Sequence, residues 1–404
     1  MVATIFSRAA LFFLSLSVLI QSTDSEFAFA ADCSSHEATS DFGKWVDPGL
    51  HLNADHPYRL LAGQAYDLGK VGSWRLQISD YTTPGSQWTA VARDADGRPL
   101  SVIRPDPTRA SGTSVWTERL RSPEVSLEVR GLKKDQGYLL IGGATAYGPE
   151  GGGDVRLFST KGPTPDWGDP YETGGDSIRS AADAVGMLLT GATDQAGIMK
   201  TWSCSGVLIS DSLLLTNWHC GGGAWLNAAS YWNDEVLADC LVDFRWDNGR
   251  SSAQYGCSRM ISESKALDYA ILSLKPLAGG PALSSLPGPA AIDTRASATS
   301  IYVIHHARSL PKLLSKNCSV DLTGKADVNF FYHNCDTDPG SSGGAVFSAD
   351  TNKIVGLHHA GFKRDDDCMP IDRRNEAVKI HAVFSDACRR SASDMGQLCQ
   401  TLHD

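Results

Sequence analysis

Long apolar runs, basic clusters and helical periodicity are all scarce in this sequence of 404 residues. Beyond residue 31 no stretch is apolar enough to cross a bilayer, which takes about 20 apolar residues, so no membrane span is expected. Lysine and arginine nowhere cluster densely enough for a nucleic-acid footprint, and the net charge of −10 suits an acidic protein that must stay in solution. Because helical periodicity is nearly absent before the C-terminal tail, the pattern favours an all-β fold.

The N-terminus carries the longest apolar run of the chain. Arg8 is the only charge ahead of the apolar residues 9–20, and residues 28–30 offer a small-residue cleavage site, which is typical of a secretory signal peptide over residues 1–31. Asp32 directly before Cys33 argues against a lipoprotein anchor. We therefore expect a secreted protein, extracellular or periplasmic, that is a monomer.

Ten cysteines lie outside the predicted signal peptide and indicate a set of disulfides. Cys204 and Cys220 are the strongest pair, because a bond between them ties the strand before His219 to the residue after it. The sequence does not prove the remaining connectivity. Proximity along the chain suggests Cys240–Cys257, Cys318–Cys335 and Cys388–Cys399, which leaves Cys33 and Cys368 as a tether between the two ends.

The length allows about two to three domains. Residues 32–160 contain short alternating runs separated by turn residues, which predicts a small antiparallel β-sandwich and possible pro-domain. Residues 161–179 are rich in proline, glycine and aspartate and are expected to be a linker, with proteolysis near Arg179–Ser180. Residues 180–404 hold further short strands and are expected to form a second β domain.

The most informative stretch is residues 336–347, DTDPGSSGGAVF. A serine flanked by glycines, Ser342, can occupy a tight turn with its hydroxyl exposed and backbone N–H groups turned toward a substrate. Upstream, His219 follows an apolar strand in LLLTNWHC, and Asp268 is a single carboxylate entering the apolar run of ALDYAILSL. The order along the chain is histidine, aspartate, serine. It is the order of one known catalytic triad, in which the histidine is the base, the aspartate is the acid that orients it, and the serine is the nucleophile that attacks a carbonyl.

Other interpretations of these residues are open. Residues 340–344 also fit the G-x-S-x-G elbow of α/β-hydrolases, but that fold needs a helix after the serine, whereas two strands joined by a hairpin are predicted here. Each residue also has a purely structural interpretation. Ser342 could lie in a glycine-rich turn, His219 could be a hydrogen-bonded core histidine, and Asp268 could cap the end of a strand. Asp243 in CLVDFRW is the rival acid, and Asp268 is preferred because a triad carboxylate must be buried and apolar residues follow it.

Seven segments in the correct order, among them SCSGVLIS, LLLTNWHC, LDYAILSL and IVGLHHAG, resemble the secreted bacterial trypsin-like serine proteases. The likeness covers residues 180–390 and is closest to the glutamyl endopeptidase (V8-like) branch, with the lysyl endopeptidases more distant. It implies a chymotrypsin-like double β-barrel, with His219 and Asp268 on the first barrel and Ser342 on the second. It also implies protein or peptide substrates and an oxyanion hole from the N–H groups of Gly340 and Ser342.

The same resemblance bears on the residue before the cleaved bond, P1. Thr337, His358 and Asn375 stand where the glutamyl enzymes line their S1 pocket. A hydroxyl and an imidazole N–H can both donate to a substrate carboxylate, and positive charge on His358, or on nearby Lys363, Arg373 or Arg374, would add to that binding. Cleavage after glutamate is therefore expected. Asp336 keeps a Lys/Arg-specific enzyme open as the alternative, since digestive relatives hold a selecting carboxylate there. A catalytically silent protease-like binding protein is the remaining alternative.

One departure from the digestive enzymes concerns activation. Those enzymes place an aspartate directly before the nucleophile, where it pairs with a newly freed N-terminus, and this chain has Ser341. Activation through that ion pair is therefore not expected. Residues 94–97, 365–367 and the pair His305-His306 lack a full ligand set for calcium or zinc, so no metal or cofactor is expected.

Overall fold

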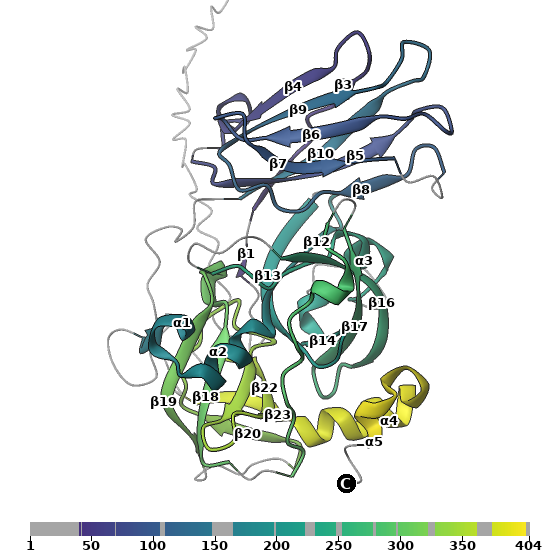
Figure 1. The fold of residues 1–404 in the computed structure, drawn as a ribbon. Coiled ribbons are helices and arrows are strands. Elements are labelled where there is room, and N and C mark those ends of the chain that lie inside the picture. Colours follow the sequence, from purple (N-terminus) through teal and green to yellow (C-terminus); the bar gives the residue numbers. More distant parts are fainter. Residues whose placement is uncertain are drawn as a thin grey trace, which may run out of the picture.

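The computed structural model describes residues 40–41, 43–68, 70–105, 110–147, 165–197, 199–222, 231–247, 253–277, 280–295, 298–321, 328–361 and 374–400. Strands dominate these residues, and they form a sandwich followed by two barrels (Figure 1). The predicted signal peptide lies outside them. Within the described ranges, no helix is long and apolar enough to cross a membrane.

The N-terminal unit is a sandwich of two antiparallel sheets, as predicted. One sheet has the order β2-β10-β5-β8 with β3 also on β10, and the other has the order β4-β9-β6-β7. The strands are β2 (Lys44–Val46), β3 (Leu50–Leu52), β4 (Tyr58–Ala62), β5 (Ser73–Asp80), β6 (Thr89–Arg93), β7 (Pro99–Ile103), β8 (Ser114–Trp116), β9 (Glu124–Arg130) and β10 (Leu139–Tyr147). Leu76 and Ile78 of β5 face Val125 and Leu127 of β9 in one apolar core, because alternate residues of a strand share a face.

Two closed six-stranded barrels follow the sandwich, and they confirm the chymotrypsin-like double barrel. Pairing of β13 with β14 closes barrel 1, and pairing of β19 with β20 closes barrel 2. Barrel 1 consists of β12 (Val185–Thr193), β13 (Met199–Leu208), β14 (Leu213–Thr216), β15 (Leu241–Asp243), β16 (Gln254–Ser264) and β17 (Tyr269–Pro276). Barrel 2 consists of β18 (Ser300–His305), β19 (Leu313–Asp321), β20 (Phe330–His333), β21 (Ala345–Ser348), β22 (Ile354–Ala360) and β23 (Asn375–Lys379).

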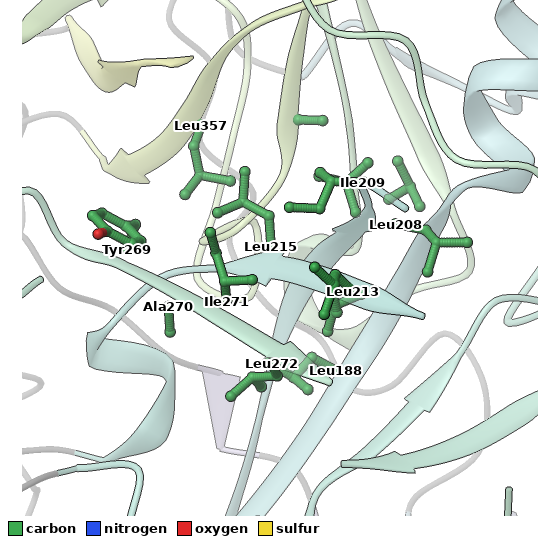
Figure 2. Packing of buried hydrophobic residues seen from close by; sticks show 14 of the residues in the cluster. Leu188, Leu208, Ile209, Leu213, Leu215, Tyr269, Ala270, Ile271, Leu272 and Leu357 are labelled. Atoms are coloured by element: carbon green, nitrogen blue, oxygen red, sulfur yellow. The ribbon is translucent and has the colours of Figure 1, made fainter. Parts of the chain in front are cut away.

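The apolar interior of barrel 1 continues into barrel 2. Leu188, Leu215 and Ile271 belong to barrel 1 and Leu357 belongs to β22 of barrel 2, yet all four lie in one buried cluster (Figure 2). Their strands read as nearly unbroken apolar runs because both faces are covered, one by the barrel interior and the other by neighbouring elements. This shared core brings the loops at the junction of the two barrels close together.

Part of the segment predicted to be a linker is structured. Strand β11 (Trp167–Gly168) pairs with β19, and short strand β1 (Ser40–Asp41) likewise extends barrel 1 at β13. Helix α1 (Pro170–Thr173) is capped by the Asp169 side chain, which accepts from Tyr171 N. Helix α2 (Asp176–Asp183) contains the expected cleavage site, where Arg179 Nε donates to Tyr171 O at 3.1 Å. Proteolysis there stays a prediction and would require α2 to unwind.

Three α-helices of the described residues lie within or after the barrels: α3 (Asp234–Asp239), α4 (Ile380–Met395) and α5 (Gln397–Gln400). Disulfides hold several of these elements together. Each of the four in the described residues joins a pair predicted from the sequence, namely Cys204–Cys220, Cys240–Cys257, Cys318–Cys335 and Cys388–Cys399. The suggested Cys33–Cys368 tether lies outside the described residues.

Buried charge joins the sandwich to barrel 1. Arg75 of β5 points away from the sandwich core, is 1 % exposed, and its Nη1 lies 3.0 Å from Asp239 Oδ1 at the end of α3. Beside it, Arg119 lies over the Trp246 ring at 3.3 Å, and its backbone N–H donates to Gln254 Oε1 at 2.6 Å. The interface therefore contains charges that are satisfied only while the two units are in contact.

Arg75→Met should lower the free energy of unfolding by about 3–5 kcal/mol, because it leaves the Asp239 carboxylate buried without its counter-charge. Urea unfolding of the full chain measures this, and the double variant Arg75→Met/Asp239→Leu should recover most of the loss. The control is Arg98→Met in an exposed hairpin, which should stay close to the parent. A single-variant loss below about 1 kcal/mol would contradict the interpretation of this interface.

Candidate active site

His219 and Asp268 meet at one end of barrel 1. Strand β14 ends at Thr216 and His219 begins the short helix η2 (His219–Gly221), while Asp268 closes the turn before β17 with a φ of 47°, which aspartate tolerates better than most residues. His219 Nδ1 lies 2.7 Å from Asp268 Oδ2, and the backbone N–H of His219 donates to Oδ1 at 3.0 Å. Because Nδ1–H donates its hydrogen bond to the ionised carboxylate, Nε2 carries no proton and is the acceptor that a general base needs.

Asp268 is buried, and neighbouring side chains contact both its backbone carbonyl and its carboxylate. Asn217 Nδ2 donates to the Asp268 carbonyl oxygen at 2.7 Å, and His359 Nδ1 lies 3.3 Å from Asp268 Oδ2. Burial by itself raises the pKa of Asp268, but the charge and hydrogen bond of His219, with a smaller contribution from His359, bring the pKa well below its usual range. Asp268 is therefore an anion at neutral pH.

The rival acid, Asp243, has other partners. Its Oδ2 lies 3.3 Å from Arg121 Nη2 of the sandwich unit, and its Oδ1 accepts from Arg245 N at 2.9 Å. Asp243 thus contributes to the interface between the sandwich and barrel 1, whereas Asp268 contacts the imidazole of His219.

Ser342 lies in the loop before β21 and is 5 % exposed. Glycines bend this loop, with φ of 95° at Gly340 and 81° at Gly343. A Cβ atom on Gly343 would lie 2.0 Å from Ser205 O and 2.5 Å from Thr216 Oγ1, so no side chain fits there. The glycine after the serine is needed because the loop approaches the backbone of barrel 1 this closely.

Ser205 of β13 attaches the serine loop to barrel 1. Its N–H donates to Ser342 O at 2.7 Å, and its hydroxyl donates to Gly340 O at 2.9 Å. The Cys204–Cys220 disulfide joins the neighbour of Ser205 to the neighbour of His219. The structure therefore brings the predicted base, acid and nucleophile to one junction between the barrels.

The two N–H groups predicted to form an oxyanion hole sit in fixed peptide planes. Pro339 O accepts from Arg308 N at 2.7 Å, and Ser341 O accepts from Gly344 N at 2.8 Å. In a trans peptide the N–H points opposite to the C=O, so the N–H of Gly340 points away from Arg308 and that of Ser342 points away from Gly344. The two carbonyl bonds therefore set the direction of both donors.

A network inside barrel 2 supports this loop. The Arg308 guanidinium pairs with the buried carboxylate of Asp338 at 3.0 Å. Ser341 Oγ accepts from Asp338 N at 3.0 Å and lies 2.7 Å from His305 Nδ1. Burial lowers the pKa of His305 to about 3, with a smaller opposing effect of Asp336, so His305 is neutral. At the position where digestive enzymes use an ion pair to a freed N-terminus, this chain has hydrogen bonds within one barrel.

The predicted S1 residues are all buried: Thr337 is 2 % exposed, His358 3 % and Asn375 0 %. His358 has a partner that the sequence did not indicate, because His333 Nε2 lies 3.2 Å from His358 Nδ1. The backbone N–H of Cys335 donates to His333 Nδ1 at 3.2 Å, so the His333 proton is on Nε2 and points at His358. This fixes the tautomer of His358 with its own proton on Nε2.

The expected positive charge on His358 is wrong. Burial, with smaller contributions from His333 and other histidines, holds the pKa of His358 well below its usual range. Burial also lowers the pKa of His333 to about 3. Both rings are therefore neutral at physiological pH, and His358 offers an uncharged N–H donor. In the sequence FFYHNC, His333 stands two residues before Cys335, whose backbone N–H fixes the His333 tautomer. This short spacing was the one sequence signal for the contact of His333 with His358.

One group of side chains in the described residues has metal-binding spacing. Ligand atoms of Cys204, His219 and Cys220 lie within 4.8 Å of one another, but the two cysteines are joined as a disulfide. Thiolate ligation there would require reduction of that bond, so this group fits a covalent brace beside His219 better than a metal site.

Residues 204–357 match the family model of the trypsin-like peptidase domain. The chain contains a trypsin-like peptidase domain. The matched residues run from Cys204 in β13 to Leu357 in β22, and they include His219, Asp268 and Ser342.

Similar proteins were found by sequence and by structure. The uncharacterized protein y4fB of Sinorhizobium fredii is 32 % identical over 203 residues, which are 47 % of this chain and 28 % of that protein. The active form of the Rv3671c protease of M. tuberculosis is 15 % identical with a TM-score of 0.37, covering 59 % of this chain and 92 % of that one. The thermostable serine protease AL20 of an extremophilic microorganism is 14 % identical with a TM-score of 0.38, covering 53 % and 99 %.

The buried neutral histidines of barrel 2 predict loss of stability in acid. Burial lowers the pKa of His305, His306, His333 and His358 in the folded protein, whereas each ring binds a proton near pH 6.5 once unfolded. Their stabilising contribution is therefore complete above about pH 6.5 and is lost as the pH falls, by about 1.4 kcal/mol per pH unit for each ring.

Urea unfolding between pH 8 and 5 measures this slope (a range chosen around the histidine pKa of about 6.5). His333→Gln should reduce the slope by about one proton, even if it lowers stability at every pH. The control is His56→Gln, since His56 is exposed on the sandwich and hydrated in both states. Equal slopes in the parent and His333→Gln would contradict the prediction.

Proposed function

We propose that this protein is a secreted serine endopeptidase that hydrolyses peptide bonds through an acyl-enzyme on Ser342. The observation that carries the proposal is the 2.7 Å contact between His219 Nδ1 and the buried Asp268 carboxylate, beside a serine loop tied to barrel 1 through Ser205. Burial of an ionised carboxylate is costly. A catalytic role for the imidazole explains why the chain carries this cost, whereas a catalytically silent binding protein gives no reason for it.

Ser342, His219, Asp268 and two backbone N–H groups carry the steps of the proposed reaction. The Ser342 hydroxyl attacks the substrate carbonyl while His219 Nε2 takes its proton and then passes it to the leaving amine. Asp268 stays ionised and stabilises the imidazolium form of His219. The N–H groups of Gly340 and Ser342 bind the oxyanion, each contributing about 3–4 kcal/mol to the transition state. Water then attacks the acyl-enzyme with His219 again acting as base, which releases the new carboxyl terminus and restores Ser342.

Export is supported by the four disulfides, since such bonds persist in oxidising compartments. The division into a sandwich over residues 32–160, a linker over 161–179 and a peptidase domain over 180–404 remains part of the proposal. The buried Arg75–Asp239 pair supports a sandwich that stays bound to the peptidase domain, in contrast to a pro-domain that is released.

For the residue at P1 we propose glutamate. Asp336, the carboxylate that would favour lysine or arginine, accepts from Asp166 N at 2.8 Å through Oδ2, and Trp167 Nε1 donates to its carbonyl oxygen at 3.0 Å. These contacts support an Asp336 side chain that holds the segment around β11. The Lys/Arg-specific alternative needs the Asp336 carboxylate in the S1 pocket, and these contacts argue against that position.

Donors for an acidic side chain are available on His358 of β22 and on Thr337 of the serine loop. The network through His333 gives His358 a proton on Nε2. Among the described residues, Thr337 Oγ1 is buried with no hydrogen-bond partner, and a buried hydroxyl of this kind is costly unless a ligand satisfies it. Asn375 Nδ2 donates to Cys335 O, which holds the segment between β20 and Thr337. Two neutral donors support binding of a carboxylate without a permanent cation.

Labelling with a fluorophosphonate tests the nucleophile. Mass spectrometry should map the adduct to Ser342, and Ser342→Ala should fold normally but lose labelling and roughly 10⁴–10⁶ of kcat, because the triad acts as a unit. The control is the exposed Ser285→Ala, which should label like the parent. A parent that does not label would favour the silent binding protein.

A fluorogenic peptide library varied at P1 tests the specificity. Cleavage after glutamate should exceed cleavage after lysine or arginine, and Thr337→Val should reduce kcat/KM for glutamate by about 10-fold or more, since a hydrogen bond to a charged group is lost. Cleavage after uncharged P1 residues should change little in that variant. Preference for lysine or arginine in the parent, abolished by Asp336→Asn, would replace this proposal with the alternative.

A further inference from the structure

Two adjacent histidines on β22 face different barrels. Successive residues of a strand point to opposite faces, so His358 meets His333 inside barrel 2 while His359 points to barrel 1. There His359 Nδ1 lies 3.3 Å from Asp268 Oδ2, the same oxygen that His219 Nδ1 contacts at 2.7 Å. Nothing in the residue order His219, Asp268, Ser342 assigns a role to this second imidazole.

We propose that His359 is a positioning residue that acts on the reaction through Asp268. The inference rests on the proposed serine-protease function. Asp268 Oδ1 accepts from the His219 backbone N–H, and Oδ2 receives both imidazoles, so three donors fix the rotation of one carboxylate. His359 is the only one of the three that comes from barrel 2, which makes the orientation of the acid dependent on the docking of the two barrels.

The surroundings of His359 favour the ring orientation that this role needs. Glu376 Oε2 on β23 lies 3.9 Å from His359 Nε2, within ion-pair range, and the Phe330 ring packs at 5.2 Å from the imidazole. A carboxylate thus stands near each ring nitrogen, Asp268 at Nδ1 and Glu376 at Nε2. The other titratable groups near His359 are His219 across the junction and His333 and His358 within barrel 2.

The two donors on Asp268 Oδ2 share its negative charge. If His359 is lost, the carboxylate charge is less dispersed and interacts more strongly with protonated His219, so the apparent pKa of the catalytic base should rise. The carboxylate also gains rotational freedom, which should reduce the fraction of His219 rings in the correct orientation. Removing the His359 donor should therefore have two effects at once: a lower reaction rate and a higher apparent pKa on the acid side of the pH–rate profile.

Two amide variants separate the donor from the bulk of the ring. The amide nitrogen of Asn occupies the place of imidazole Nδ1, whereas that of Gln occupies the place of Nε2, so His359→Asn keeps the donor to Asp268 and His359→Gln removes it. The rate of Ser342 labelling by a fluorophosphonate is measured from pH 5 to 9 (around the histidine pKa of about 6.5). This probe does not depend on P1 specificity.

His359→Gln should label about 10-fold more slowly at pH 8, with its acid-side midpoint raised by about half a pH unit, while His359→Asn stays within about threefold of the parent. With the best peptide substrate, His359→Gln should lower kcat and leave KM within about twofold, because ground-state binding is untouched. Glu376→Gln should give a smaller change in the same direction.

Three results would overturn the inference. A parent that labels while His359→Gln labels with the same rate and midpoint overturns it and leaves the proposed function standing. Equal losses of labelling rate in His359→Asn and His359→Gln also overturn it, because they would mean that His359 contributes through packing and not through its hydrogen bond to Asp268. A parent that does not label at all overturns the proposed function itself, and this inference falls with it.

Discussion

The buried negative charge of Asp268 is the constraint on which the catalytic junction depends. An ionised carboxylate inside a protein is costly unless donors surround it, and here the donors come from the backbone and the imidazole of His219 in η2 and from His359 in β22 of the other barrel. These elements meet only when both barrels have closed and share their core. The donors that offset the cost of burying this carboxylate also keep it ionised and aligned, so the stability of the junction and the orientation of the base have one physical origin.

Much of the fold and the centre of the candidate site could be predicted because their signals are local. Alternating strands and the glycines that flank Ser342 each occupy a few consecutive residues. The disulfide pairs followed from proximity because the four bonds span sequence separations of only 11 to 17 residues. The assignment of the triad roles still depends on the proposed experiments.

Contacts between distant residues could not be predicted. His359 meets Asp268 across 91 residues and Arg75 meets Asp239 across 164, and an alternating strand pattern marks both side chains as solvent-facing or core without naming a partner. The segment before barrel 1 was predicted to be a linker because proline, glycine and aspartate also serve as helix caps, and the composition is the same in both cases. A tautomer such as that of His358 depends on a hydrogen bond that exists only in the folded chain.

Ser205 has a mechanical consequence. One residue of barrel 1 holds two carbonyls of the loop that carries Ser342, and its hydroxyl also accepts from His306 N of barrel 2 at 2.9 Å. A swing of one barrel away from the other would pull these bonds apart together and turn the peptide planes that they fix. The two barrels are therefore held as one rigid unit at the loop that carries Ser342. For the proposed endopeptidase, this rigidity would favour target segments that are already extended or loosely held, since the barrels could not move apart to admit a folded one.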